Sequence, residues 1–190
     1  ALMVFAGMLP WFLFSTILSE SSNSLVTNSS LVGKVYFPRL VIPSAAAVVS
    51  LVDFLISLAI MVLMMVWFWF WPDWRVLFLP VFIFLAAAAA LGPALLFSAL
   101  NVKYRDFRYI IPFIVQFGLY VSPVGFSSAN IPEDWRLLYG LNPMVGVIDG
   151  FRWCLLGGEA ALHLPSFALS LGVTAFFLWY GIRVFRRTEK

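Results

Sequence analysis

The chain has 190 residues, of which 63% are hydrophobic and 11% charged, with a net charge of +3 at pH 7. Soluble domains average about 45 to 50% apolar and about 25% charged residues, so this composition excludes an ordinary soluble protein and indicates an integral membrane protein. One cysteine, Cys154, excludes an intramolecular disulfide, and with one histidine, His163, no Cys/His metal site is expected. No run of like charges suggests nucleic-acid binding.

Apolar runs of about 20 residues are long enough to cross a hydrocarbon core of about 30 Å. The sequence predicts an all-α, polytopic transmembrane helical bundle with five spans, at about residues 2–18, 41–71, 76–100, 109–126 and 164–182. The first span starts at the first residue, with no initiator Met and no polar flank. We therefore expect a further N-terminal segment and span to precede it.

The segment between the last two spans, about residues 130–158, has apolar residues interrupted by proline, glycine and charged residues. Such a sequence is too polar to face lipid as one spanning helix. It predicts two short re-entrant helices that dip into one face of the membrane. Asp149 and Arg152 lie three residues apart, and a predicted pair between them on one helical face makes their partial burial tolerable.

Lysine and arginine are concentrated in alternate loops. Nine of the twelve cations follow the first, third and fifth spans: Lys34, Arg39, Lys103, Arg105, Arg108, Arg183, Arg186, Arg187 and Lys190. The opposite side carries three cations and five acids: Arg75, Arg136, Arg152, Asp73, Glu133, Asp134, Asp149 and Glu159. By the positive-inside rule the basic side is the cytoplasm, which places the C-terminus there.

Gly33-Lys34 raises the question of a nucleotide site. A phosphate loop needs G-x-x-x-x-G-K-[ST], whereas Val35 follows here and no glycine lies five residues before Gly33. No ATP binding by that route, and no cofactor on this chain, is expected.

Hydrolytic groups are also not indicated. His163 is predicted to form an i, i+4 surface pair with Glu159, and Glu133-Asp134 to be the first-turn acids of a helix. The chain is therefore not expected to be an enzyme.

Asp53 is the clearest ionisable residue deep in a predicted span. A bare carboxylate in lipid is costly, so such a residue is a functional candidate by default. Two interpretations stay open: a structural hydrogen bond to a neighbouring helix, or a role in transport. An ion-coupled carrier usually has several midplane charges, and only Asp53 is found here.

A short helix is predicted over residues 31–37. Candidate caps at Asn28 to Ser30 precede it, and Pro38 disfavours helix at Phe37 and ends it. Apolar residues recur four apart beside Lys34, which predicts a two-turn amphipathic helix on the cytoplasmic face.

Five blocks along the chain resemble ABC-2 type permeases of polysaccharide exporters. They are "PWFLFSTIL" (10–18), "NSLVTNSSLVGKVYFPRLVIP" (23–43), "SALNVKYRDFRYIIPFIVQ" (98–116), "YVSPVGF" (120–126) and "LYGLNPMVGVIDGFRWCLLG" (138–157). The O-antigen permeases are the most similar group, with capsule and teichoic acid permeases as relatives. The blocks occur in order over almost the whole chain.

The resemblance implies a six-span permease of the bacterial inner membrane, preceded by a cytoplasmic amphipathic segment. Two copies pair, and two separate ATPase subunits, which hold ATP and Mg, drive a lipid-linked polysaccharide through the transmembrane channel. Residues 130–158 correspond to periplasmic re-entrant helices near the pore exit. The coupling helix that contacts the ATPase corresponds to 31–39, with Leu31, Gly33, Lys34, Val35, Tyr36, Phe37 and Arg39 as coupling residues.

A polymer needs many weak contacts, because tight binding stalls it. Phe113, Phe117, Tyr120 and Phe126 recur near helical spacing and are candidate lining residues, with ordinary packing as the alternative. Other functions considered are ABC-2 export of capsule, teichoic acid, drug or lipid, an ion-coupled carrier, and a membrane enzyme acting on lipid-linked sugars. The enzyme requires a cluster of acids, bases or metal ligands at one membrane face, and no such cluster is evident in the loops.

Overall fold

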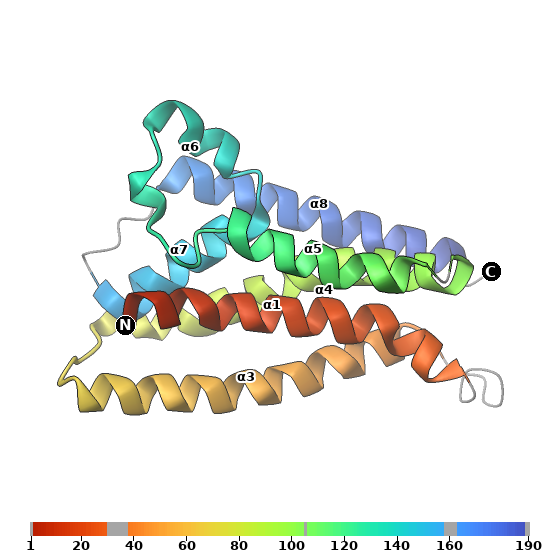
Figure 1. Ribbon diagram of the computed structural model, residues 1–190, viewed down its shortest axis with the longest axis horizontal. Helices are drawn as coiled ribbons and strands as arrows, with labels where there is room; N and C mark the ends of the chain where they lie inside the picture. Colours follow the sequence, from red (N-terminus) through yellow and green to blue (C-terminus); the bar gives the residue numbers. More distant parts are fainter. Residues whose placement is uncertain (1, 30–37, 105, 158–162, 189–190) are drawn as a thin grey trace.

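A computed structural model describes residues 2–29, 38–104, 106–157 and 163–188 (Figure 1). These residues form helices joined by turns, which confirms the predicted all-α bundle. The predicted helix over 31–37 lies outside the described residues.

Among the described residues, four helices are long and apolar enough to cross a membrane. They are α1 (Leu2–Thr27), α3 (Val41–Trp67), α4 (Leu79–Lys103), which the 3₁₀ turn η1 (Trp74–Phe78) precedes, and α8 (Leu164–Thr188). At about 1.5 Å per residue each is about 37 to 40 Å long, more than the roughly 30 Å of a hydrocarbon core. The protein is a multi-pass membrane protein.

The long helices run side by side along the longest axis of the molecule (Figure 1). α4 packs between α1 and α8, and α3 packs along α1. Ala86 to Ala90 of α4 are all buried, and their small side chains allow the neighbouring helices to approach closely. The centre of the bundle is therefore the α1–α4 contact, with α3 and α8 on its two sides.

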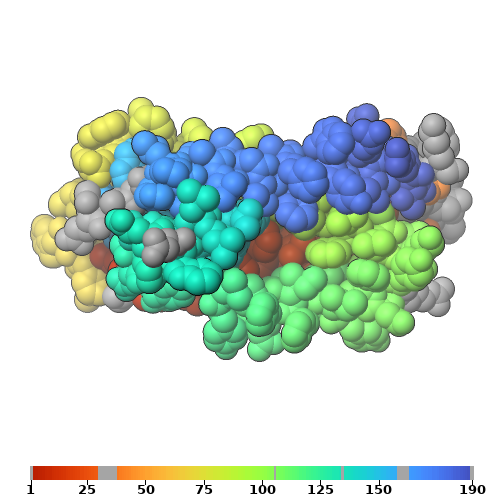
Figure 2. All heavy atoms as spheres, turned by 90° about the horizontal axis from the view of Figure 1, so that it is seen from above, coloured from red at the N-terminus to blue at the C-terminus, as the bar shows by residue number. Residues whose placement is uncertain are grey.

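Four shorter elements lie between α4 and α8. They are α5 (Phe107–Val121), the 3₁₀ turn η2 (Ser128–Asn130), α6 (Glu133–Tyr139) and α7 (Pro143–Leu156). α7 packs against α1, α4 and α8, and α6 packs on α8. Figure 2 shows residues of α1 at the surface between α5 and α8, so these two helices are separated there.

α5 ends earlier than the predicted span of about residues 109–126. Its last residue is Val121, and Ser122 has extended backbone angles because Pro123 disfavours helix at the residue before it. The 15 residues of α5 span about 22 Å, which is short of a hydrocarbon core. The predicted span of about 41–71 also ends early, at Trp67, and Trp69 then adopts a positive φ of 55°.

A close contact between two of the long helices joins α4 and α8 at two glycines. A Cβ on Gly92 would lie 2.6 Å from the backbone carbon of Phe177, and a Cβ on Gly181 would collide with the carbonyl oxygen of Gly92. Van der Waals packing holds helices together in lipid, so this close approach stabilises the α4–α8 pair.

Replacing Gly181 with alanine is expected to lower the thermal stability of the protein in detergent, because overpacking a close contact costs about 1–3 kcal/mol. Fluorescence-detected size-exclusion chromatography after heating measures this change. Gly172→Ala is the matched control on the same helix, since a Cβ there meets nothing within 4 Å. Equal melting behaviour of the two variants would contradict the packing account.

Candidate functional site

A buried arginine lies where α1, α7 and the α5–α6 connection (residues 122–132) meet. Arg152 of α7 is 2% exposed, although it carries a full charge. Its Nη1 donates to the carbonyl oxygen of Phe126 at 2.7 Å, and its Nη2 to that of Val124 at 2.7 Å. Its Nε donates to the carbonyl oxygen of Met3 at 3.3 Å. One guanidinium therefore links three separate parts of the chain.

These hydrogen bonds offset two free-energy costs, that of the buried guanidinium charge and that of buried carbonyl groups without donors. A buried charge is costly unless it is hydrogen-bonded, and a buried carbonyl group without a partner is costly too. The turn after α5 leaves Val124 and Phe126 outside any helix, so their carbonyl groups have no helical donor. Hydrogen bonds to an ionised donor are stronger than neutral ones, which makes the arginine an effective partner for both.

Gly7 of α1 provides the space for the guanidinium. A Cβ at this position would lie 2.6 Å from Nη2 of Arg152 and 2.8 Å from the carbonyl oxygen of Val124. Any larger residue would push α1 away from the turn.

Asp149 and Arg152 do not form the predicted direct pair. Within the described residues the one ion pair joins Arg75 and Asp73. Asp149 instead accepts a hydrogen bond from Ser128 Oγ at 2.6 Å, and Ser128 follows Phe126, whose carbonyl group Arg152 binds, by two residues. Both charged side chains of α7 therefore contact the α5–α6 connection, and the attraction between their charges acts at longer range.

The residues around α6 bind the same connection from its other side. Tyr139 donates its hydroxyl proton to the carbonyl oxygen of Val121, and Asn142 Nδ2 donates to Ser122 Oγ at 2.9 Å. Arg136 Nη2 donates to the carbonyl oxygens of Ala129 and Ile131 at 3.1 and 3.2 Å.

Burial raises the pKa of the Tyr139 phenol to about 12, and the nearby carboxyl of Asp149 adds to the rise. At neutral pH the phenol therefore keeps its proton and remains a donor to Val121. The connection is thus hydrogen-bonded both to α7 and to the residues around α6. These bonds fix the position in space of the C-terminal end of α5.

Three of the four candidate lining residues share one face of α5. Phe113, Phe117 and Tyr120 are at least 60% exposed, and the rings of Phe113 and Phe117 stack at 6.2 Å with an interplanar angle of 10°. The opposite face of α5 contacts the bundle through buried Ile111. At about 100° per residue, Phe113 and Tyr120 lie about 200° and about 180° around the helix from Ile111.

The fourth candidate, Phe126, lies in the α5–α6 connection beyond the end of α5. It is 39% exposed and its ring is 6.4 Å from that of Tyr139. It therefore does not belong to the aromatic face formed by Phe113, Phe117 and Tyr120. The aromatic face of α5 points away from the helix bundle of this chain.

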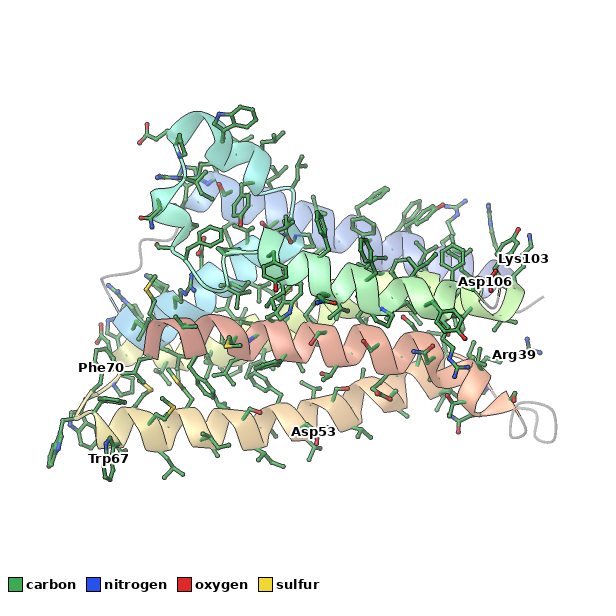
Figure 3. All side chains as sticks on the ribbon, viewed as in Figure 1. Arg39, Asp53, Trp67, Phe70, Lys103 and Asp106 are labelled. Carbon is green, nitrogen blue, oxygen red and sulfur yellow. The ribbon has the colours of Figure 1, made fainter. Side chains whose placement is uncertain are left out.

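Asp53 is exposed near the middle of α3 (Figure 3). Its backbone carbonyl accepts from Ser57 Oγ at 3.2 Å, but among the described residues its carboxylate has no hydrogen-bond partner. The interpretation in which Asp53 bonds a neighbouring helix thus gains no support within these residues.

Basic side chains gather at one end of the bundle. Arg39 and Lys103 lie at this end together with the acidic Asp106, opposite Trp67 and Phe70 (Figure 3). Arg39 is exposed in the turn that precedes α3. The other predicted coupling residues, Leu31 and 33–37, lie outside the described residues.

No group of three His, Cys, Asp or Glu side chains gathers in the described parts of the chain. His163 Nδ1 is 2.8 Å from Ser166 Oγ at the start of α8, and its predicted partner Glu159 is not among the described residues. The hydrogen bonds of Arg152 position α7 against the start of α1 and the α5–α6 connection.

Sequence reasoning missed Gly7, Ser128 and Tyr139 as parts of this site. The acceptors for Arg152 and Tyr139 are backbone carbonyl groups, which leave no mark in a residue pattern. The signal in the sequence is the place of Arg152 in an apolar segment, because an arginine there requires several acceptors.

The chain belongs to the ABC-2 type transporter family, whose model matches residues 1–156. It is 28% identical over 190 residues to the O-antigen export system permease protein RfbA of Myxococcus xanthus, covering 98% of this chain and 73% of the relative. Two proteins of the same name from Klebsiella pneumoniae are each 24% identical, covering 93% and 96% of this chain and 71% and 70% of their own lengths.

Arg152→Met is expected to destabilise the protein strongly. Methionine fills similar space but cannot donate to Met3, Val124 and Phe126. The carbonyl groups of Val124 and Phe126 have no helical donor, and each orphaned carbonyl group costs about 1–3 kcal/mol. Thermal denaturation in detergent measures the effect, and Arg108→Met, at an exposed position, is the control. An unchanged midpoint for Arg152→Met would show that the three bonds do not hold the connection.

Proposed function

We propose that this chain is the permease subunit of an ATP-binding cassette exporter for a lipid-linked polysaccharide of the O-antigen type. The observation that carries the proposal is the similarity over 93 to 98% of the chain to three proteins named as O-antigen export permeases. Family membership and four long apolar helices agree with a transport role in a membrane.

In this proposal the basic end of the bundle faces the cytoplasm and the membrane is the bacterial inner membrane. At this end Arg39 precedes α3, Lys103 ends α4, and Arg108 lies in the first turn of α5. The arginines of the last turns of α8 belong to the same end. The positive-inside rule supports this orientation, which also makes the C-terminus cytoplasmic.

ATP hydrolysis belongs to a separate ATPase subunit, which holds ATP and Mg; this chain has no cofactor of its own. The contact with it is proposed to involve Leu31, Gly33, Lys34, Val35, Tyr36, Phe37 and Arg39, in the connection between α1 and α3. Ser21 Oγ of α1 donates to the carbonyl oxygen of Pro43 in α3 at 2.8 Å, so the two helices that flank this connection are joined. A displacement of the α1–α3 connection by the ATPase would then move both helices together as a rigid body.

The polysaccharide path is proposed to lie between two copies of the permease. The aromatic face of α5 supports this, because it points away from the bundle and offers flat apolar rings. Phe113, Phe117 and Tyr120 would contact sugar rings weakly and without demanding one sequence, so the polymer keeps moving.

The nearest alternative is export of a capsule polysaccharide, teichoic acid, drug or lipid by another ABC-2 permease. The proposal is tested in a strain from which the gene for this chain is deleted. Restoring the gene should restore the O-antigen ladder on gels of extracted lipopolysaccharide, together with surface labelling by antibody. A strain that exports O-antigen normally without the gene would overturn the assignment of substrate.

Replacing Val35 and Tyr36 together with serine is expected to reduce export at least tenfold while the protein remains in the membrane. The loss follows if this apolar face docks on the ATPase, and co-purification of the two subunits should fall in parallel. Val41→Ser, at a 54% exposed position at the start of α3, is the control. Normal export by the double variant would contradict the coupling role.

Replacing Phe113, Phe117 and Tyr120 with alanine is expected to slow polysaccharide export severalfold without lowering ATPase binding. Phe176→Ala on α8 is the control, because this ring is 57% exposed and stacked on Tyr180 at 5.9 Å in the same manner. Surface O-antigen measured after a pulse of sugar label gives the rate. If both variants export equally, the aromatic face of α5 does not line the path.

A further inference from the structure

A hollow lies at the C-terminal end of α8, on the side turned away from α4. It has a volume of about 460 Å³ and is lined by Trp179, Ile182, Arg183, Arg186 and Arg187. The opposite side of α8 is buried at Gly181 and Phe185, which face the bundle. The hollow therefore belongs to the outer surface of the helix, and Figure 2 shows this part of α8 at the surface of the molecule.

Three arginines give the hollow a strongly positive charge. Arg183, Arg186 and Arg187 are all exposed, and no acidic residue is among its described lining residues. The only ion pair in the described ranges, between Arg75 and Asp73, lies elsewhere in the chain. Arginine binds phosphate through two parallel hydrogen bonds, so three of them in two turns favour a phosphate group.

One of the arginines is held in place by an aromatic ring. The guanidinium carbon of Arg183 lies 5.1 Å from the ring centroid of Trp179, which is a cation–π contact. This contact limits the movement of a long side chain and so lowers the entropy lost when the arginine binds a ligand.

The hollow is also placed at the level of lipid headgroups. The 25 residues of α8 span about 37 Å, so its last turns extend beyond a hydrocarbon core of about 30 Å. Tryptophan prefers the interface, and arginine beyond it reaches the phosphate layer. Along α8 the lining changes from apolar at Trp179 and Ile182 to basic at Arg186 and Arg187, in the same order as a lipid changes from acyl chain to headgroup.

We propose that this surface of α8 is a binding site for an anionic phospholipid, with the phosphate on the three arginines and an acyl chain along Trp179 and Ile182. A free phosphate ion would make no contact with the apolar half of the hollow. A zwitterionic lipid lacks the net negative charge that the three arginines favour. The proposal does not depend on the identity of the exported substrate.

Native mass spectrometry of the full-length protein in detergent tests the site. Dioleoyl-phosphatidylglycerol and dioleoyl-phosphatidylcholine are titrated separately, and bound lipids are counted. The first phosphatidylglycerol should bind at least tenfold more tightly than the first phosphatidylcholine. The variant R183Q/R186Q/R187Q should lose this preference, with about a fivefold loss of affinity for each arginine removed.

The matched control is R39Q/K103Q/R108Q, which removes the same charge from the same end of the bundle and should change the affinity less than twofold. Trp179→Ala keeps all three charges and should weaken binding severalfold. The three single arginine variants replace the triple variant if that one does not fold.

Three results would overturn the proposal. They are an equal loss of affinity in the two triple variants, an unchanged affinity in Trp179→Ala, and displacement of phosphatidylglycerol by excess inorganic phosphate. The last would identify a site for free anions in place of a lipid site.

Discussion

The hydrogen bonds of one buried guanidinium determine how the short elements of this protein sit on the long ones. Between α5 and α6 the chain leaves the α-helical conformation, so buried carbonyl groups of this connection need donors from elsewhere in the chain. Arg152 binds two of these carbonyl groups and one from the start of α1, at 2.7, 2.7 and 3.3 Å. Without this arginine the connection would have to move outward to find donors, and the end of α5 would move with it.

α1 takes part in buried hydrogen bonds to other segments near both of its ends. Near its start Met3 accepts from Arg152 and Gly7 makes room for the guanidinium. Near its end Ser21 donates to Pro43, and Asn101 of α4 donates to the carbonyl oxygen of Ser22 at 2.9 Å. α1 thus connects the proposed ATPase side with the connection that positions α5. In the proposed function, this is the route by which a push from the ATPase reaches the aromatic face.

The sequence predicted those features that depend on residues close together in the chain, such as the length of apolar runs and helical spacing. Apolar length predicted the long helices, and Leu164 begins α8 where the last span was expected to start. Spacing also predicted that Phe113, Phe117 and Tyr120 share a face. The sequence was uninformative where contacts form between distant segments, because the acceptors for Arg152 are backbone atoms more than 20 residues away. The expected Asp149–Arg152 pair was wrong for the same reason: each side chain has better partners in the α5–α6 connection.

The most direct test of the proposed function is transport by the purified components. The full-length permease and its ATPase subunit are reconstituted in liposomes with a fluorescently labelled, lipid-linked O-antigen, and its transfer across the bilayer is followed by quenching from one side. The account predicts transfer that requires both the ATPase subunit and hydrolysable ATP. Equal transfer by the permease alone, without ATP, would contradict it.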